Sequence, residues 1–288
     1  MPDTSIAGSL SREQVAFYNT EGYLVIPHLL TDADLAPAVE SMAAKVSEIA
    51  DGLAADGLIS DKLEDWPFKT RLAGLFANLT DAHFLKYGRS WRDRLPGYYR
   101  LMMNPKILDL VESLIGGEIF ANPIYNTRPK VPKVAAGQVP WHQDKSYWPD
   151  ANANPVITVW IPFVDADLDN GCLHIMPRTH TRQVQSWHRE QYTGTQYTEI
   201  DEAHVRGGQV VPLPLETGGA ILFNDRCIHM STANHTDHVR WSVDLRYQPT
   251  DQDPMFNKGI GFLARSRQHP ERVATEADWL AERPEHVG

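Results

Sequence analysis

The stretch from Ile119 to Tyr247 constrains the fold of this chain more than any other feature. It consists of short apolar or alternating runs, such as PVITVWIPFV, GGAILFND and VRWSVDLRYQ, with proline, glycine and Asn-Gly between them. Runs of this length bounded by turn residues predict strands, and many short strands at close spacing favour a β-sandwich or a closed barrel. The dipeptide Asn170-Gly171 predicts a two-residue hairpin turn, because both residue types tolerate positive φ.

The residues before this stretch, from about 11 to 115, have mainly helical spacing. Ser11 and Gln14 occupy N-cap and capping-box positions, and Gly22 is placed to end that first helix. Apolar residues at three- and four-residue spacings predict a second, longer helix within residues 30–54, with Thr31 or Asp32 as its N-cap. The tail after residue 250 is charged and returns to helical spacing around EADWLAERP.

These patterns predict an α+β fold that is mainly β. We expect a single domain over residues 1–288, because neither a linker nor an internal repeat divides the chain. In this domain a helical part (about 11–115) packs on an antiparallel β core (about 119–249), and a C-terminal extension (250–288) follows.

Composition argues against several classes of protein. With 27 Lys and Arg against 37 Asp and Glu, the net charge of −10 disfavours nucleic acid as a partner. The longest nearly apolar stretch, Val156 to Val164, is far shorter than the roughly 20 residues that cross a bilayer, and the opening MPDTSIAG lacks signal-peptide features. The two cysteines, Cys172 and Cys227, are too few for a disulfide scaffold. We therefore expect a cytoplasmic protein without a membrane partner.

Three residues could bind a metal ion together. His142 and Asp144 are two residues apart in WHQDKSYW, a segment that looks extended, and residues i and i+2 of a strand project from the same face. Such a pair alone is a weak signal and could be a surface contact. His229, after a distant apolar strand, would complete two histidines and one carboxylate, a set typical of non-haem Fe(II) oxygenases.

Several blocks occur in an order that points to one family. They are SREQVAFYNTEGYLVIPHLLTDADL, WHQD, NGCLHIMPRTH and GGAILFNDRCIHMSTANHTDHVRWSVDLRYQ. In these blocks the sequence resembles the phytanoyl-CoA dioxygenase (PhyH) family of Fe(II)/2-oxoglutarate-dependent oxygenases over most of the chain, with residues 51–97 the least familiar part. The resemblance implies a double-stranded β-helix, which is a cupin-like jelly roll with helices packed on one sheet. It also implies Fe(II) as the metal, with 2-oxoglutarate and O2 as co-substrates.

The resemblance assigns His142, Asp144 and His229 as iron ligands and Arg240 as the partner of the distal carboxylate of 2-oxoglutarate. Fe(II), one carboxylate and a doubly charged 2-oxoglutarate leave one net negative charge, so a buried site needs a further cation, and a guanidinium binds a carboxylate well. Further contacts with the co-substrate are expected at Ser231, Trp160 and Asn126. Trp160 is equally suited to be a core residue.

The substrate pocket is less well defined by the sequence. In VRWSVDLRYQ one face carries Asp244 and Arg246 together with Arg240, while the apolar residues of the other face should pack under the N-terminal helices. Asp244 and Arg246 either line the pocket or are charges exposed at its rim. Other pocket candidates are Arg128, Gln138 and Tyr147, whereas Lys130 and Lys133 are expected at the surface. Aromatic residues that could cover the pocket are Trp66, Phe68, Tyr87, Trp91, Tyr98, Tyr99, Tyr147 and Trp148.

The implied activity is hydroxylation of an unactivated C–H bond of a small molecule, with release of succinate and CO2. The iron centre would carry the chemistry without a separate acid or base residue, and desaturation or cyclisation stays open. The alternative is a catalytically inactive or redox-neutral cupin-like metal-binding protein. A halogenase is disfavoured, because Asp144 stands where a halogenase has a small residue. The substrate and the oligomeric state are not predicted.

Overall fold

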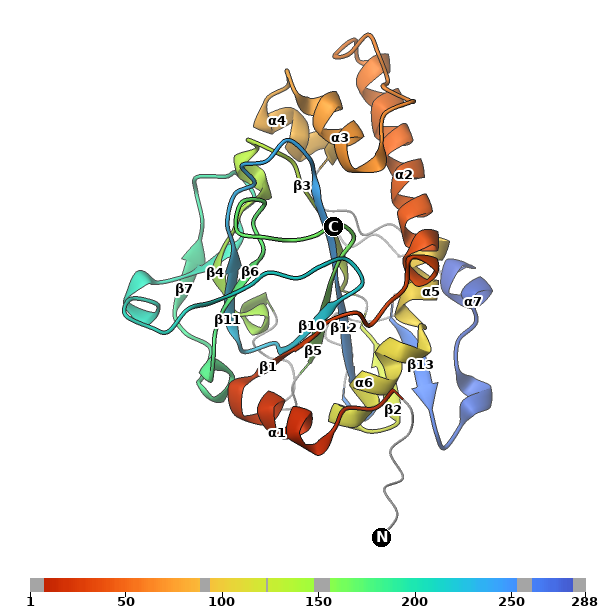
Figure 1. The fold of residues 1–288 in the computed structure, drawn as a ribbon, viewed down its shortest axis with the longest axis vertical. Helices are drawn as coiled ribbons and strands as arrows, with labels where there is room; N and C mark the ends of the chain where they lie inside the picture. Colours follow the sequence, from red (N-terminus) through yellow and green to blue (C-terminus); the bar gives the residue numbers. More distant parts are fainter. Residues whose placement is uncertain (1–7, 89–93, 123, 148–155, 253–260, 282–288) are drawn as a thin grey trace.

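The computed structural model describes residues 8–88, 94–122, 124–147, 156–252 and 261–281. Figure 1 shows its labelled helices above, below and to the right of two antiparallel sheets. The fold class predicted from the sequence is confirmed. The helices are α1 (Arg12–Glu21), α2 (Asp32–Ala55), α3 (Phe68–Phe76), α4 (Asp81–His83), α5 (Pro96–Met102), α6 (Pro105–Ile115) and α7 (Glu276–Ala281).

The larger sheet has seven strands. Its order is β1 (Tyr23–Ile26), β10 (Ala220–Asn224), β5 (Ile157–Pro162), β12 (Arg240–Pro249), β2 (Glu118–Ala121) and β13 (Phe262–Ser266), and β3 (Asn126–Lys130) also pairs with β12. The smaller sheet has the order β4 (Val139–His142), β11 (Ile228–Ser231), β6 (Leu173–Met176) and β9 (Val211–Leu213). A separate ribbon contains β7 (Trp187–Arg189) and β8 (Thr198–Ile200).

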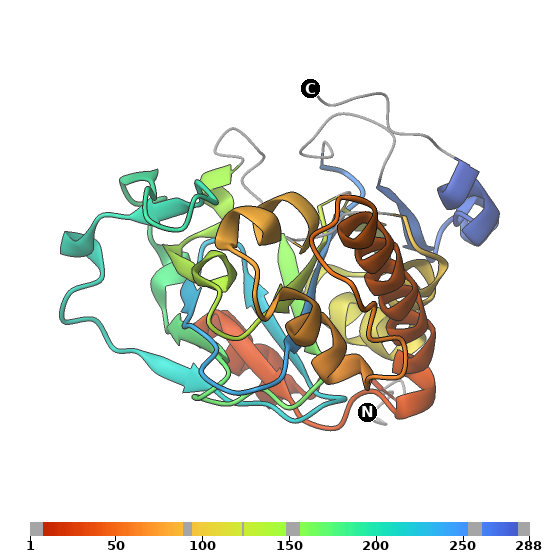
Figure 2. The ribbon, with the colours of Figure 1, turned by 90° about the horizontal axis from the view of Figure 1, so that it is seen from above.

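The first two helices begin as their sequences predict. Ser11 and Thr31 each form a capping box, and Gly22 ends α1 with a φ of 84°. Helices α2 and α5 lie on the side of the larger sheet that faces away from the smaller sheet (Figure 1). Figure 2 shows the same helices from above. Gly97 permits their contact, since a Cβ there would lie 2.0 Å from the carbonyl oxygen of Pro37.

Strand β12 turns one face toward the helices and the other toward the interior between the two sheets. Its apolar face packs under the helical layer as predicted: the ring of Trp241 stacks on Phe68 with 4.7 Å between centroids, and the Tyr247 hydroxyl donates to the carbonyl of Met102 over 3.0 Å. The opposite face turns its polar side chains toward the smaller sheet.

One prediction about a turn is wrong, and the C-terminal extension contains one element more than expected. Asn170-Gly171 does not form a hairpin between neighbouring strands, because the chain there crosses from β5 in the larger sheet to β6 in the smaller one. Only Gly171 has positive φ, and the Asn170 side chain instead bonds the backbone of Asp165 and Asp167. The C-terminal extension contributes strand β13 to the larger sheet in addition to the expected helix α7.

Within the described residues, none of the helices is both long and apolar enough to cross a membrane.

Candidate metal centre

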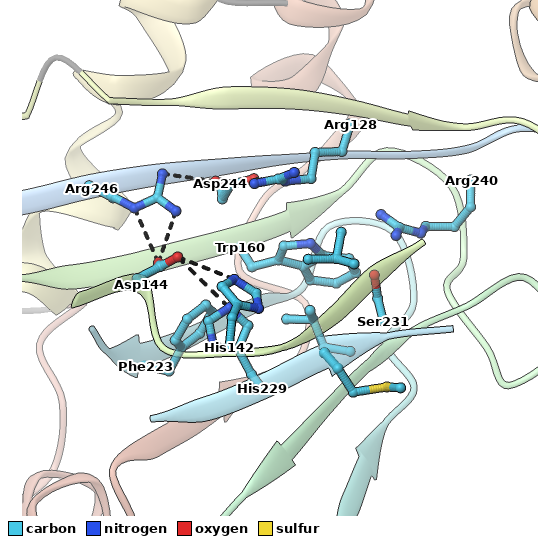
Figure 3. A pocket seen from close by; sticks show the side chains of 13 residues that line it. Arg128, His142, Asp144, Trp160, Phe223, His229, Ser231, Arg240, Asp244 and Arg246 are labelled. Atoms are coloured by element: carbon cyan, nitrogen blue, oxygen red, sulfur yellow. Dashed lines mark hydrogen bonds and ion pairs between the residues drawn. The ribbon is translucent and has the colours of Figure 1, made fainter. Parts of the chain in front are cut away.

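The three predicted metal ligands lie together between the two sheets. His142 ends β4 and is the direct cross-strand partner of His229 on β11, with 4.1 Å between their ring centroids. One ligand atom from each of His142, Asp144 and His229 lies within 4.8 Å of the other two, and all three side chains are buried. Figure 3 shows the cluster at one end of a cavity.

The local structure at Asp144 differs from the prediction. Strand β4 ends at His142, and Asp144 is the first residue of a short 3-10 turn, Asp144–Tyr147, so the extended conformation does not continue to the carboxylate. The turn nevertheless directs Asp144 to the site. Its Oδ1 lies 3.5 Å from Nε2 of His142 and 4.0 Å from Nε2 of His229.

Backbone contacts orient both imidazoles. The Nδ1 atom of His142 lies 2.9 Å from the carbonyl oxygen of Pro140, and that of His229 lies 3.0 Å from the carbonyl oxygen of Cys227. A carbonyl only accepts, so each Nδ1 carries the proton and each Nε2 keeps a lone pair for a metal. Burial, followed by the neighbouring His142, lowers the pKa of His229 to about 3, which keeps this ring neutral.

The carboxylate of Asp144 is held from its other oxygen. Oδ2 accepts from Oγ1 of Thr158 at 2.8 Å and from the guanidinium of Arg246, whose two nitrogens lie at 2.9 and 3.2 Å. Burial alone would raise the pKa of Asp144. The charge of Arg246 and a contact with His142 nevertheless hold this pKa well below its usual range. Two imidazole nitrogens and one carboxylate oxygen fit a divalent transition metal such as Fe(II).

Arg240 lies at the other end of the same cavity, as Figure 3 shows. Its guanidinium is buried, lies 5.4 Å from the ring centroid of Trp160 and donates to Ser242. Its Nε has no hydrogen-bond partner in the described part of the chain. Burial and the charge of Arg128 lower the pKa of Arg240 to about 9, so the group stays charged at neutral pH. A buried guanidinium with a free donor suits a carboxylate ligand.

Of the residues predicted to contact the co-substrate, Ser231 and Trp160 line this cavity. Trp160 is also buried in a hydrophobic cluster, as expected of a core residue, and its contact with the co-substrate stays a prediction. Asn126 is not among the lining residues; its amide donates to Asp244 over 2.9 Å.

The residues on the polar face of β12 are buried. Asp244 and Arg246 both line the cavity, so the alternative that they are exposed rim charges is wrong. They form an ion pair of 2.8 Å. Arg128 also lines the cavity and donates from Nε to Asp244 over 2.7 Å.

Lys130 is the residue that the sequence analysis missed. It was expected at the surface but is buried, and its Nζ donates to Oγ of Ser231 over 2.8 Å and to the carbonyl of Thr232. Burial and the charge of Arg240 lower the pKa of Lys130 well below its usual range, which favours the neutral amine. Alternation along β3 could have indicated this position, because Lys130 is the cross-strand partner of Arg240.

The remaining pocket candidates lie away from the cavity lining. Gln138 is half-buried, and Tyr147 packs its ring against His142 with 6.0 Å between centroids. The other aromatic residues that were expected to cover the pocket do not line the cavity either, within the described residues. Trp66 is exposed, and Tyr98 lies in the main core. Trp91 and Trp148 lie outside the described residues.

The jelly-roll core and its buried pair of histidines with one carboxylate define a cupin-like, non-haem metal protein. Comparison with known families makes the assignment more specific. The family model for phytanoyl-CoA dioxygenase (PhyH) matches residues 18–242, and the chain belongs to this family. The family and its structural neighbours are non-haem iron, 2-oxoglutarate-dependent oxygenases, and the His-Asp-His set of this chain is the set that such enzymes use.

Relatives differ in how much of their length is matched. The mouse phytanoyl-CoA dioxygenase domain-containing protein 1 is 30% identical over 188 residues, which are 59% of this chain. The match covers 63% of that relative, so the chain spans less than two thirds of its length. The human peroxisomal phytanoyl-CoA dioxygenase is 25% identical over 255 residues, which cover 84% of this chain and 69% of the human protein.

Solved structures share the fold. The apoform of EctD from S. alaskensis has a TM-score of 0.61 at 20% identity, with 95% of this chain and 89% of EctD covered. The epimerase SnoN, solved with Fe3+, alpha ketoglutarate and nogalamycin RO, has a TM-score of 0.54 at 21% identity, covering 96% of this chain and 90% of SnoN.

Proposed function

We propose that this protein is an Fe(II)/2-oxoglutarate-dependent dioxygenase that hydroxylates a C–H bond of a small molecule. One observation carries the proposal: a buried His142, Asp144 and His229 cluster shares a cavity with the buried, partly unpartnered guanidinium of Arg240. The cluster would hold the iron. Arg240 would hold the distal carboxylate of 2-oxoglutarate, with the hydroxyl of Ser231 beside it.

When bound, the iron centre would couple the oxidation of 2-oxoglutarate by O2, which yields succinate and CO2, to insertion of the second oxygen atom into a substrate C–H bond. The protein would orient and shield these reactants. Thr158 and Arg246 hold Oδ2 of Asp144, while apolar side chains of Val139, Leu173 and Phe223 in the lining limit the access of water. This chemistry needs no separate acid or base.

The outcome of the reaction on the substrate is a further part of the proposal. A carbocyclase, SnoK, and an epimerase, SnoN, share this fold, so the fold alone allows outcomes other than hydroxylation. Asp144 disfavours halogenation, because it fills the coordination position that a halide would need. Buried free thiols at Cys172 and Cys227 support the proposed cytoplasmic location.

The test measures succinate formed from 2-oxoglutarate by the iron-loaded protein in air, with a panel of small molecules. We expect the wild type to form succinate and the Asp144→Ala variant to lose at least about 100-fold of that rate, because the metal loses a ligand. Asp109→Ala, which removes a carboxylate that pairs with Arg265 on β13, is the matched control and should stay active. If the iron-loaded wild type neither binds 2-oxoglutarate nor forms succinate, the oxygenase proposal is wrong, and the redox-neutral metal protein becomes the better description.

A further inference from the structure

The two oxygens of Asp144 have different environments. Oδ1 lies near both imidazoles, whereas Oδ2 is occupied by Thr158 and Arg246. These two donors come from the larger sheet, where Thr158 on β5 and Arg246 on β12 are direct cross-strand partners. The pair therefore presents its donors to the same oxygen from one rigid part of the sheet, as Figure 3 shows for Arg246.

Arg246 is itself fixed on its far side. Its NH1 lies 2.8 Å from Oδ2 of Asp244 and donates to the carbonyl of Ile124 over 3.2 Å. Asp244 in turn accepts from Arg128 and Asn126. This network is buried, so the Arg246 guanidinium has little freedom to leave Asp144.

These contacts bear on what Arg246 can do. Its Nε and both terminal nitrogens already donate to Asp144, Asp244 or Ile124. A guanidinium has five N–H donors in a fixed fork, and here at least one on each nitrogen is used by the protein. The arrangement therefore favours an action through Asp144 over the direct substrate contact that strand alternation suggested for Arg246.

The consequence concerns the way in which Asp144 binds a metal. A carboxylate with a free second oxygen can bind through both oxygens, which would use one more coordination position. An iron site of this kind needs three open positions, two for 2-oxoglutarate and one for O2. With Oδ2 held by Arg246 and Thr158, only Oδ1 is left for the metal.

We propose that Arg246, assisted by Thr158, is a positioning residue that restricts Asp144 to one metal-binding oxygen and thereby keeps the remaining coordination positions open. This inference rests on the metal site of the proposed function. It concerns the mode of coordination, so it can be tested without any substrate.

The experiment titrates the purified metal-free protein with Co(II) and records both the dissociation constant and the visible Co(II) spectrum. Arg246→Lys keeps the positive charge but removes the two-point hydrogen bond, and Thr158→Val removes one donor without any change of charge. A change in either variant therefore reports the orientation of Asp144 rather than the charge of the site. The matched control is Arg265→Lys on β13, which alters the ion pairs of Arg265 with Asp109 and Glu112 on α6.

We expect Arg246→Lys to weaken Co(II) binding by about 10-fold or more, the lower end of what loss of an outer partner costs, and Thr158→Val to weaken it less. Both variants should change the Co(II) spectrum, because Oδ2 becomes able to join the coordination. In their Co(II)-loaded form, both variants should also bind 2-oxoglutarate more weakly than the wild type does. Arg265→Lys should match the wild type in all three measurements.

The proposal is overturned if both variants match the wild type in Co(II) affinity and spectrum within about 2-fold, even if their free energy of unfolding in urea falls. That result would mean that Arg246 and Thr158 only stabilise the fold. If Arg246→Lys does not fold, Thr158→Val alone decides. A wild-type protein that binds no Co(II) would contradict the metal site itself, and the inference would fail with it.

Discussion

At the scale of single residues, two buried basic side chains lie side by side on the neighbouring strands β3 and β12. Arg240 and Lys130 are cross-strand partners, and neither forms an ion pair within the described residues. Burial, followed by the charge of Arg240, lowers the pKa of Lys130 well below its usual range. The guanidinium of Arg240, with a pKa of about 9, is charged at neutral pH, and a bound carboxylate would compensate that charge.

We therefore expect Arg240→Met to weaken 2-oxoglutarate binding to the Co(II)-loaded protein by at least about 30-fold, because truncating one partner of a buried charge pair costs roughly 2 kcal/mol or more. Calorimetric titration with 2-oxoglutarate measures the effect. Lys130→Met should cost clearly less, because its amine already donates to Ser231 and to the carbonyl of Thr232. Equal losses in the two variants would show that Arg240 has no special role.

Local sequence patterns predicted part of this site. Alternation in VRWSVDLRYQ correctly placed Arg240, Asp244 and Arg246 on one face. The same kind of alternation along β3 could have placed Lys130 beside Arg128, but it was not used. The 3-10 turn at Asp144 was not predictable from local pattern, because the carboxylate is held by a partner distant in the sequence, Thr158.

At the scale of elements, the start of α2 is tied to the start of α6. Asp34 completes the capping box of Thr31. Its carboxylate also accepts hydrogen bonds from Lys106 at 2.6 Å and from Asn104 at 2.9 Å. Partial burial acts to raise the pKa of Asp34. These hydrogen bonds outweigh burial, with that of Lys106 the strongest among them, and lower the pKa below its usual range. The carboxylate form is thus favoured in the folded state, and it joins two helices that cover the larger sheet.

Asp34→Asn keeps an oxygen for the cap and removes the charge. Because the folded-state pKa lies below the unfolded value of about 3.9, the charge stabilises fully above about pH 5 and progressively less as the pH falls toward the folded-state pKa. We expect the wild type to be more stable than the variant by about 1 kcal/mol at pH 7, with the difference shrinking below about pH 4. Urea unfolding from pH 7 to pH 3.5 measures this, with Glu48→Gln at an exposed pair with Lys45 as the control. A difference that does not change with pH would contradict the role of the charge.

The elements differ in how far the sequence could predict them. Capping signals at Ser11 and Thr31 act within a few residues, so both helices were predictable. Strand β13 exists because it pairs with β2 more than 130 residues earlier, and its pattern is interrupted by a bulge between Leu263 and Arg265. The Asn170-Gly171 pattern was misleading because side-chain bonds of Asn170 form a turn without pairing of the adjacent strands.

At the scale of the whole molecule, the site joins the two sheets. The two proposed ligand histidines belong to the smaller sheet, whereas Arg240 belongs to the larger one. The main hydrophobic core includes residues of α2, α5 and β12, so these helices and the larger sheet share one core. The single domain over residues 1–288 stays a prediction. The pairing of His142 with His229 followed from the family resemblance, because no local pattern contains a contact between residues so far apart in the sequence.

This arrangement predicts that metal and 2-oxoglutarate stabilise the protein together. A ligand that binds only the folded state adds about 2.7 kcal/mol at 100 times its dissociation constant, which for a chain of this size raises the Tm by roughly 5 °C. We expect Co(II) alone to raise the Tm, and 2-oxoglutarate to raise it further only when Co(II) is present, because the co-substrate would connect a metal on the smaller sheet to Arg240 on the larger one. Differential scanning fluorimetry measures both shifts, and Asp144→Ala should lose them. A 2-oxoglutarate shift of equal size without metal, or in Asp144→Ala, would mean that the co-substrate binds independently of the cluster.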